Sequence, residues 1–419
     1  MPQRRSPAPS GSGFTSLAAG RVGAAILSWV WLLLVARILP VDDFGVLALL
    51  LAIGSIVSVV ADLGLPLVLM QEASQRPGAV WTALVITTRK RLVAGVVASG
   101  LVVAAFSVSA PGRGLAFPAV YSVSIIATTV YTSVAAALRA IGSARVEAAN
   151  ELASRLFVLV VGGTMLVSGR GLLAAVAAYA MADLGSALLL WKVAHRQLAH
   201  RREDVDGNRF AIPRTAPLAA GGILGTLYNR VDIWLLALMA SNTSVAIYAA
   251  AYRILDGLLL PSSALSSLVV PRTAKMSVTG RKPVVGRLIR RSLLLLAPVA
   301  FGIALLSGPI LQTAFGADYA ASAPVLATLM LSALPGAAIF VLAPIAALAD
   351  RFAFLRAVVV ALVVNVGANV VLIPAHGVVG AALATVLSQT ILWWALARVA
   401  NGRGSDNITP SRSHSVSHA

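Results

Sequence analysis

Four charged residues lie inside two long apolar segments of the chain, residues 217–240 and 245–270. They are Arg230, Asp232, Arg253 and Asp256. Each segment is long enough to cross a bilayer, because about 20 apolar residues in a helix span about 30 Å of hydrocarbon. An ionised side chain at that depth is costly unless it has a partner or faces a wet cavity. All four are therefore candidate substrate-binding residues.

The spacing of these charges leaves two interpretations open. Arg253 and Asp256 stand at i and i+3 and can meet on one helix face, whereas Arg230 and Asp232 at i and i+2 point apart. In the first interpretation the four charges neutralise one another, with Asp232 reaching Arg253 and Arg230 reaching Asp256. In the second, at least Arg230 lines a cavity near the bilayer midplane, where a guanidinium can bind a phosphate through two hydrogen bonds. The two interpretations are compatible if the substrate competes with the aspartates for binding to the arginines.

Asp183 lies near the middle of another apolar segment, residues 171–191, without a partner nearby in the sequence. A lone carboxylate at that depth is a candidate ion-coupling residue, because it can bind a proton or a cation. A hydrogen bond that packs two helices together is the alternative.

Two other polar sets have simpler interpretations. Glu147, Glu151 and Arg155 recur at four-residue intervals, which is typical of a local salt-bridge ladder on a helix. Asn365 and Asn369 lie one helical turn apart in an apolar segment and are either interhelical hydrogen-bonding groups or cavity lining, with the former favoured.

Several kinds of chemistry are excluded. The chain has no cysteine, which rules out disulfides, thiolate metal sites and cysteine nucleophiles. It has no Gly-x-x-x-x-Gly-Lys-Ser/Thr motif for ATP hydrolysis, and no His or carboxylate cluster with the spacing of metal ligands. Its loops are too short to hold a glycosyl-transfer domain. We therefore expect a protein that is not an enzyme and needs no metal or cofactor.

The composition indicates a polytopic membrane protein made of helices. Of the 419 residues, 58% are hydrophobic and only 11% are charged, and the mean hydropathy is +0.88. A soluble domain of this size carries far more charge. The net charge of +18 would suggest nucleic acid in a soluble chain. Here the basic residues stand in short loops between apolar segments, so they indicate membrane topology and no nucleic-acid partner.

Segment lengths predict about twelve membrane-spanning helices. The predicted spans are 18–39, 44–70, 92–110, 115–138, 150–168, 171–191, 217–240, 245–270, 291–311, 321–349, 356–374 and 378–397. The shorter apolar stretch 79–88 either lies at the membrane interface or extends the third helix.

The spans divide the chain into two halves. We expect one six-helix bundle at residues 18–191 and a second at 217–400, joined by a basic cytoplasmic linker at 192–216. The polar ends, 1–17 and 401–419, are predicted to be disordered. Nearly all Lys and Arg residues outside the spans fall on the side of the even-numbered loops, which places both termini in the cytoplasm. Only Arg37, Arg113 and Arg170 fall on the opposite side.

An internal repeat supports this division. Gly171-Leu-Leu-Ala-Ala175 opens the sixth span, and Gly377-Val-Val-Gly-Ala381 opens the twelfth. The two motifs are 206 residues apart, and the same distance separates Asp183 from Gln389. Glutamine carries no charge, so this correspondence favours the packing interpretation of Asp183. Such a parallel repeat relates two halves by a pseudo-twofold axis along the membrane normal, as in secondary transporters with a central cavity.

A series of short motifs runs in order along nearly the whole chain. The motifs are Ala36-Arg-Ile-Leu-Pro-Val-Asp-Asp-Phe-Gly45, Asp62-Leu-Gly-Leu65, Arg230-Val-Asp232, Ile247-Tyr248, Pro271, Phe315-Gly316, Tyr319, Asn365, Asn369, Ile373-Pro374 and Gly377-Val-Val-Gly-Ala-Ala382. In this order and spacing, the chain resembles the oligosaccharide (O-antigen type) flippase family. That family belongs to a superfamily that also contains multidrug/toxin extruders and lipid II flippases.

The resemblance implies a V-shaped carrier that works by alternating access. Its cargo would be a polyprenyl-pyrophosphate-linked oligosaccharide, moved from the cytoplasmic to the outer leaflet of the cell membrane for polysaccharide assembly. Cationic cavity residues would receive the pyrophosphate, and Arg230 and Arg253 are the positions nominated for this. Membrane lipids, a polysaccharide polymerase and glycosyltransferases are the expected partners. The alternative is a cation-coupled multidrug/toxin extruder, which the arginines in the middle of the spans disfavour. A third possibility is an accessory membrane protein of polysaccharide assembly.

Overall fold

The structure is a computed structural model that describes residues 11–273, 276 and 278–400. Over these residues the chain is helical and contains no strand. The first group of elements is α1 (Gly11–Ile38), α2 (Val41–Asp62), α3 (Leu65–Gln75), η1 (Pro77–Ala79), α4 (Val80–Ser109), α5 (Ala116–Ala140), α6 (Ala144–Phe157), η2 (Val158–Gly162), α7 (Gly163–Val167) and α8 (Gly171–Leu198). The second is η3 (Gly207–Phe210), α9 (Ile212–Met239), α10 (Asn242–Thr273), α11 (Val278–Leu305), α12 (Ser307–Phe315), η4 (Ala317–Ser322), α13 (Ala323–Met330), α14 (Ala333–Ala349) and α15 (Arg351–Ala400).

The predicted spans fall on helices, but several cross a helix boundary. Span 291–311 runs from α11 into α12, and span 321–349 includes the 52° bend between α13 and α14. The predicted span 44–70 crosses a helix boundary, because Leu63 and Gly64 both have positive φ angles, 51° and 69°, and end α2 in the left-handed conformation. The stretch 79–88 is part of α4, so it extends the third predicted span. The segment 1–17 was predicted to be disordered, and α1 begins within it at Gly11.

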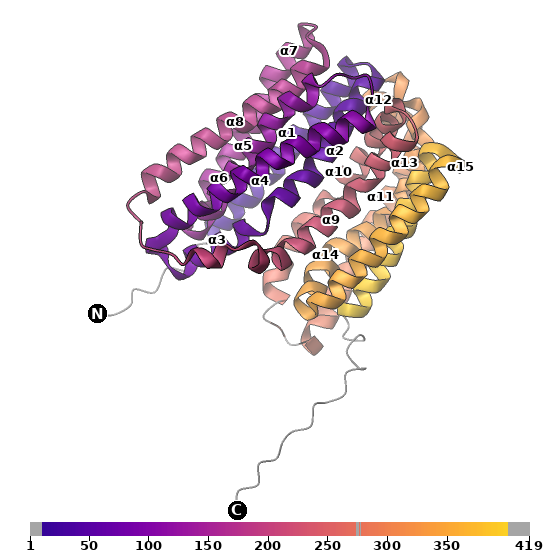
Figure 1. The fold of residues 1–419 in the computed structure, drawn as a ribbon. Coiled ribbons are helices and arrows are strands. Elements are labelled where there is room, and N and C mark those ends of the chain that lie inside the picture. Colours follow the sequence, from indigo (N-terminus) through magenta and orange to yellow (C-terminus); the bar gives the residue numbers. More distant parts are fainter. Residues whose placement is uncertain (1–10, 274–275, 277, 401–419) are drawn as a thin grey trace, which may run out of the picture.

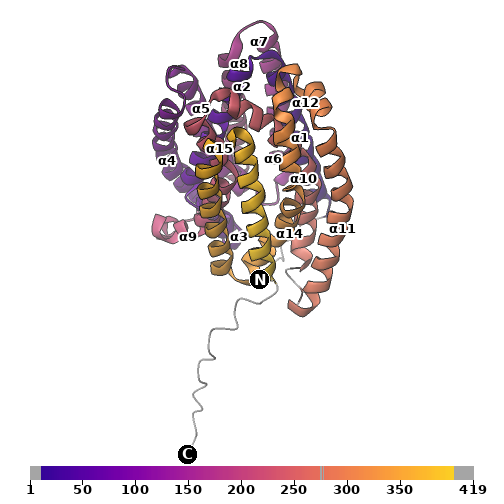
Figure 2. The ribbon, with the colours of Figure 1, turned by 90° about the vertical axis from the view of Figure 1, so that its right-hand side faces the viewer.

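Glycines at the starts of the two repeat segments both have a positive φ angle. Gly171 has φ +64° where α8 begins, and Gly377 has φ +57° at the kink inside α15. Residues with a side chain rarely adopt this conformation, so glycine is needed at both positions. The kink divides α15 into two helical arms, which lie side by side in Figure 2. The shared positive φ angle is consistent with the predicted repeat.

The helices form two groups that diverge toward one end of the molecule. In Figure 1 the indigo to magenta helices up to α8 lie on one side and the red to yellow helices α9 to α15 on the other. Within the first group α5 packs on α4 and α8, and within the second α15 packs on α9 and α14. Contacts between the groups run mainly from α2 to α9 and α10.

Long apolar helices make this a multi-pass membrane protein. Among the described residues, 8 helices are long and apolar enough to cross a membrane, or up to 9 if the bent pair α13–α14 is one span. The exposed face of α11 carries large apolar side chains, such as Leu295 at 73% and Phe301 at 66% exposure. Exposed side chains of this kind suit contact with lipid.

The two groups of helices are joined at one end of the molecule, which we call the closed end. There the Arg37 guanidinium of α1 donates to the carbonyl of Ala314 at 2.9 Å and to that of Thr313, both in the last turn of α12. The Phe44 ring of α2 packs edge-on against Tyr319, with ring centroids 5.9 Å apart. A cation at a helix C-terminus is favoured by the partial negative charge of its free carbonyls.

A second set of contacts at the closed end joins α2 to α10. Asp42 forms an ion pair with Arg113, and Thr243 at the start of α10 donates to Asp42 at 3.4 Å. A side chain at Gly45 would place its Cβ 1.9 Å from the carbonyl oxygen of Asn242, so only glycine permits this approach of α2 to α10. Two of the three arginines predicted on this side of the membrane thus hold helices together.

Candidate functional site

Arg230 and Arg253 line one small pocket, which we call the arginine pocket. It lies between α2, α9 and α10, and Ser55, Tyr252 and Ile233 also line it. Its volume is about 60 Å³, far below the roughly 300–1,000 Å³ of ordinary ligand sites. In this conformation the pocket is large enough for water only, and a larger group reaches it only through the space that adjoins it.

The two arginines differ in their partners. The Arg253 guanidinium lies 3.4 Å from the Asp256 carboxylate, the i and i+3 contact that the sequence predicted. Trp29 of α1 donates its indole N–H to the Arg253 backbone carbonyl at 3.2 Å. Arg230 forms no ion pair within the described part of the chain, so its five N–H groups are available to a ligand.

Asp232 has a hydrogen-bonding partner other than the two arginines. It is 2% exposed and accepts a hydrogen bond from the Tyr248 hydroxyl of α10. Neither ion pair of the neutral quartet, Asp232 with Arg253 or Arg230 with Asp256, is formed among the described residues. A tyrosine hydroxyl satisfies Asp232 because positions i and i+2 on α9 point the carboxylate and Arg230 in different directions.

The Tyr248 hydroxyl extends this contact into a buried polar network among α9, α10 and α15. Thr385 Oγ1 lies 2.9 Å from the Tyr248 hydroxyl. One turn further along, Ser388 accepts from the Asn365 amide at 3.0 Å, and Asn369 donates to Asn365 at 3.0 Å. All of these side chains are buried, so the asparagines act as interhelical hydrogen-bonding groups rather than as cavity lining.

Asp183 lies in a second and larger space, which we call the N-terminal cavity. This cavity has a volume of about 410 Å³ and lies among helices of the first group. Its polar lining includes Tyr121, Tyr131, Glu151, Arg155, Tyr179 and Asp183. Asp183 accepts a hydrogen bond from Ser124, so one carboxylate oxygen packs against α5 while the residue still faces the cavity. Both interpretations of Asp183 thus find support in its position.

Arg155 is a cavity residue that the sequence interpretation missed. Within the described part of the chain, no ion pair links Glu147, Glu151 and Arg155 as the predicted ladder requires, and Glu147 pairs with Arg139 of α5 at 3.3 Å. Arg155 instead lines the N-terminal cavity with Glu151. It lies shortly before the π-helical turn η2, and such turns are frequent at functional sites. The sequence contained a signal for this position, because Arg155 lies inside a predicted span, as Arg230 and Arg253 do.

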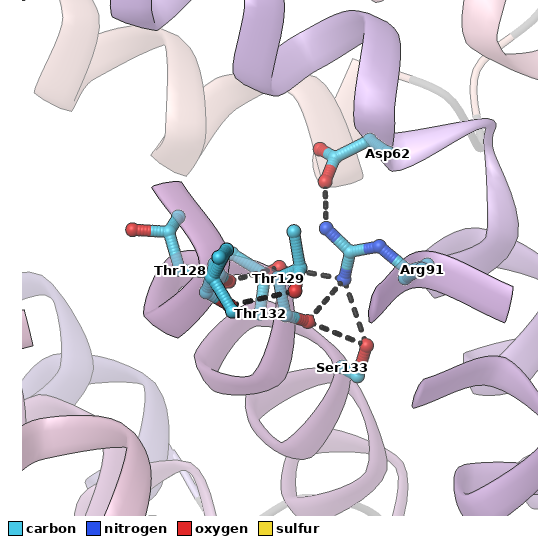
Figure 3. A network of polar contacts seen from close by, with 7 residues as sticks. Asp62, Arg91, Thr128, Thr129, Thr132 and Ser133 are labelled. Atoms are coloured by element: carbon cyan, nitrogen blue, oxygen red, sulfur yellow. Dashed lines mark hydrogen bonds and ion pairs between the residues drawn. The ribbon is translucent and has the colours of Figure 1, made fainter. Parts of the chain in front are cut away.

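Asp62 is held at the wall of the N-terminal cavity by Arg91 (Figure 3). Arg91 of α4 is 1% exposed and forms an ion pair with Asp62 at the end of α2. Its guanidinium also donates to Thr132 Oγ1 at 2.6 Å, to Ser133 Oγ at 2.8 Å and to the Thr129 carbonyl at 2.9 Å. These contacts tie α2, α4 and α5 together, and they satisfy a charge that would otherwise be costly to bury.

The arginine pocket and the N-terminal cavity adjoin each other. Leu51 and Ser55 of α2 line both spaces. A third space, of about 310 Å³, lies between α1 and α10 and reaches Arg253 and Asp256 from the other side. Arg253 therefore lines two spaces, and the pocket that holds both arginines adjoins a third, which suits the binding of a large anionic molecule.

The fold and this site define a multi-pass helical membrane protein with two groups of helices around a polar interior. The chain belongs to the polysaccharide biosynthesis protein family, whose model matches residues 10–277.

A curated relative and two solved structures are similar to the chain. It is 26% identical over 236 residues to a probable low-salt glycan biosynthesis flippase, Agl15, of Haloferax volcanii. That match covers 55% of the chain and 50% of the relative, so the chain matches only half of that protein's length.

The lipid II flippase MurJ in an inward closed conformation has a TM-score of 0.69 at 13% identity, covering 91% of this chain and 86% of that one. An inward-facing multidrug resistance MATE family transporter of the MOP superfamily has a TM-score of 0.70 at 14% identity, covering 93% and 99%. These structural likenesses show the shared fold.

Proposed function

We propose that the protein is a secondary-active flippase for a polyprenyl-pyrophosphate-linked oligosaccharide. It moves this lipid from the cytoplasmic to the outer leaflet of the cell membrane for surface polysaccharide assembly. Membership of the polysaccharide biosynthesis family and the likeness to a probable glycan biosynthesis flippase support this cargo. Both termini lie in the cytoplasm, and the protein carries its substrate without a catalytic step.

One observation carries the proposal. Two arginines on adjacent helices, α9 and α10, face the same pocket inside the membrane-spanning part, and Arg230 makes no ion pair among the described residues. An arginine without an ion pair is costly inside a membrane span, so its retention at this depth indicates a ligand with negative charge. A pyrophosphate meets this requirement, because its oxygens match the paired N–H groups of guanidinium. A cationic drug does not, which disfavours the multidrug/toxin extruder.

Roles follow for the other candidate residues. Arg253 contributes to pyrophosphate binding while Asp256 holds its guanidinium, and substrate competes with Asp256 for that group. Asp232 positions α9 against α10 through Tyr248. Asp183 is the candidate for ion coupling, because it faces the N-terminal cavity from the middle of α8.

Deletion of the gene tests the proposed function in the cell. We expect the lipid-linked glycan to accumulate on the cytoplasmic leaflet and the surface polysaccharide to disappear. Normal surface polysaccharide, together with raised sensitivity to cationic dyes, would instead assign the protein to the extruders.

A further inference from the structure

The N-terminal cavity has the size and the side chains of a sugar-binding site. Its volume of about 410 Å³ falls within the range of ligand pockets, about 300–1,000 Å³. Three tyrosines line it: Tyr121, Tyr131 and Tyr179. Tyrosine offers an apolar ring face together with a hydroxyl, which matches the apolar face and hydroxyl rim of a sugar ring.

Most of the charged side chains that line this cavity are carboxylates, which accept hydrogen bonds. Asp62 is neutralised by Arg91, which leaves Glu151 and Asp183 against Arg155. Ionised carboxylates only accept hydrogen bonds, so they bind the hydroxyl groups of a sugar, and Arg155 donates to its ring or acyl oxygens. A sugar that carries its own carboxylate would meet two like charges, Glu151 and Asp183, and one opposite charge, Arg155, so the balance of charge is unfavourable.

The position of the cavity relates it to the arginine pocket. Both spaces are lined by Leu51 and Ser55. The pyrophosphate of a lipid-linked glycan carries the polyprenyl chain on one phosphate and the first sugar on the other. With the pyrophosphate at Arg230, the polar N-terminal cavity suits the sugar, since an apolar chain gains nothing from its charged side chains.

We propose that the N-terminal cavity binds the sugar attached to the pyrophosphate and selects a neutral sugar over a uronic acid. Glu151 and Asp183 set this preference, and Tyr131 contacts the ring. Tyr131 is only partly buried, whereas Tyr121 and Tyr179 are each 8% exposed and also pack in the core. The inference rests on the proposed function, since it requires a pyrophosphate at the arginine pocket.

Three soluble analogues test the proposal by calorimetry with the purified protein in detergent. They are farnesyl pyrophosphate, farnesyl-pyrophosphoryl glucose and farnesyl-pyrophosphoryl glucuronic acid. We expect the glucose analogue to bind at least tenfold more tightly than the glucuronic acid analogue. Equal affinity for the two would overturn the proposed selectivity. Failure of all three to bind would contradict the proposed function and remove the basis of this inference.

Two variants test whether side chains of the N-terminal cavity cause the preference for glucose over glucuronic acid. Glu151→Gln keeps the shape and removes one charge, so we expect the preference for glucose to fall about tenfold. Tyr131→Leu should weaken both sugar analogues severalfold, and farnesyl pyrophosphate should bind to either variant as it does to the native protein. The matched control is Asp318→Asn, because Asp318 is an exposed carboxylate in η4, outside the cavity.

Binding of farnesyl pyrophosphate also reports whether each variant is folded. An unchanged preference in Glu151→Gln, with farnesyl pyrophosphate still bound, would overturn the role of the cavity. Arg230→Ala should instead weaken all three analogues to the same degree. This pattern separates a failure at the arginine pocket from a failure at the sugar site.

Discussion

The Arg253 guanidinium lies 3.4 Å from the carboxylate of Asp256, one turn along the same helix, while Arg230 on the adjacent helix has no such partner among the described residues. Both arginines face the same pocket. The site therefore contains one arginine that is held in place by a carboxylate and one that is free to bind. This asymmetry indicates that Arg230 contributes more to substrate binding than Arg253.

The first prediction concerns Arg230. Arg230→Ala should abolish transport of the lipid-linked glycan, because it removes the unpaired guanidinium from the arginine pocket. Arg230→Lys should restore only part of the activity, since an ammonium group cannot form the paired hydrogen bonds of guanidinium. Transport measured in membranes with matched protein levels checks this. Full activity of Arg230→Ala would reject the role.

The second prediction separates the two interpretations of Asp183. If Asp183 couples transport to an ion, Asp183→Asn should transport without dependence on the ion gradient. The Ser124 hydroxyl can still donate to the amide oxygen of the substituted side chain, so packing between α5 and α8 is retained. Initial rates with and without an imposed gradient measure the effect. Retained gradient dependence would leave Asp183 with a packing role only.

The third prediction concerns the buried Arg91. Arg91→Met should lower the free energy of unfolding by about 1–3 kcal/mol, because it leaves the partly exposed Asp62 without its cation and two hydroxyls without their donor. Thermal unfolding in detergent measures the loss. Arg89→Met is the matched control, since Arg89 is exposed on the same helix and its substitution should change stability by less than about 0.5 kcal/mol. Equal stability of the two variants would contradict the structural role of Arg91.

The fourth prediction concerns the closed end. Arg37→Ala removes the contacts between α1 and α12, so the closed end should open more often. Because the chain has no cysteine, a single Ala48→Cys at the arginine pocket can report this opening. We expect an impermeant maleimide added at the closed end to label that cysteine severalfold faster in the Arg37→Ala background.

Arg170 provides the control for this experiment. Arg170 was predicted on the same side of the membrane and is exposed just before α8. Arg170→Ala should leave the labelling rate unchanged. An equal increase in both backgrounds would indicate a general loss of stability and would contradict a specific contact at Arg37.

Most of the fold could be predicted from the sequence, because hydrophobic segments of membrane length are a strong signal. The i and i+3 pairing of Arg253 with Asp256 was predicted for a similar reason, since helix geometry alone brings those positions together. The end of α2 was missed because an apolar residue, Leu63, takes the left-handed conformation beside Gly64. A pattern of hydrophobic residues does not indicate where the backbone conformation changes.

The partners of Asp232 and Arg155 could not be predicted from spacing along the chain. The Tyr248 hydroxyl reaches Asp232 from the next helix, and Arg155 faces a cavity that residues of several helices enclose. Such contacts depend on how helices pack against each other. Sequence periodicity defines the face of one helix but not what lies opposite it.

Transport by the purified protein in liposomes tests the central claim most directly. A fluorescent polyprenyl-pyrophosphate-linked oligosaccharide is placed in the cytoplasmic-side leaflet, and its arrival in the opposite leaflet is followed with an impermeant quencher. We expect translocation well above that of protein-free liposomes and of liposomes with Arg230→Ala. Translocation no faster than in protein-free liposomes, under the same ion gradient, would contradict the proposed flippase function.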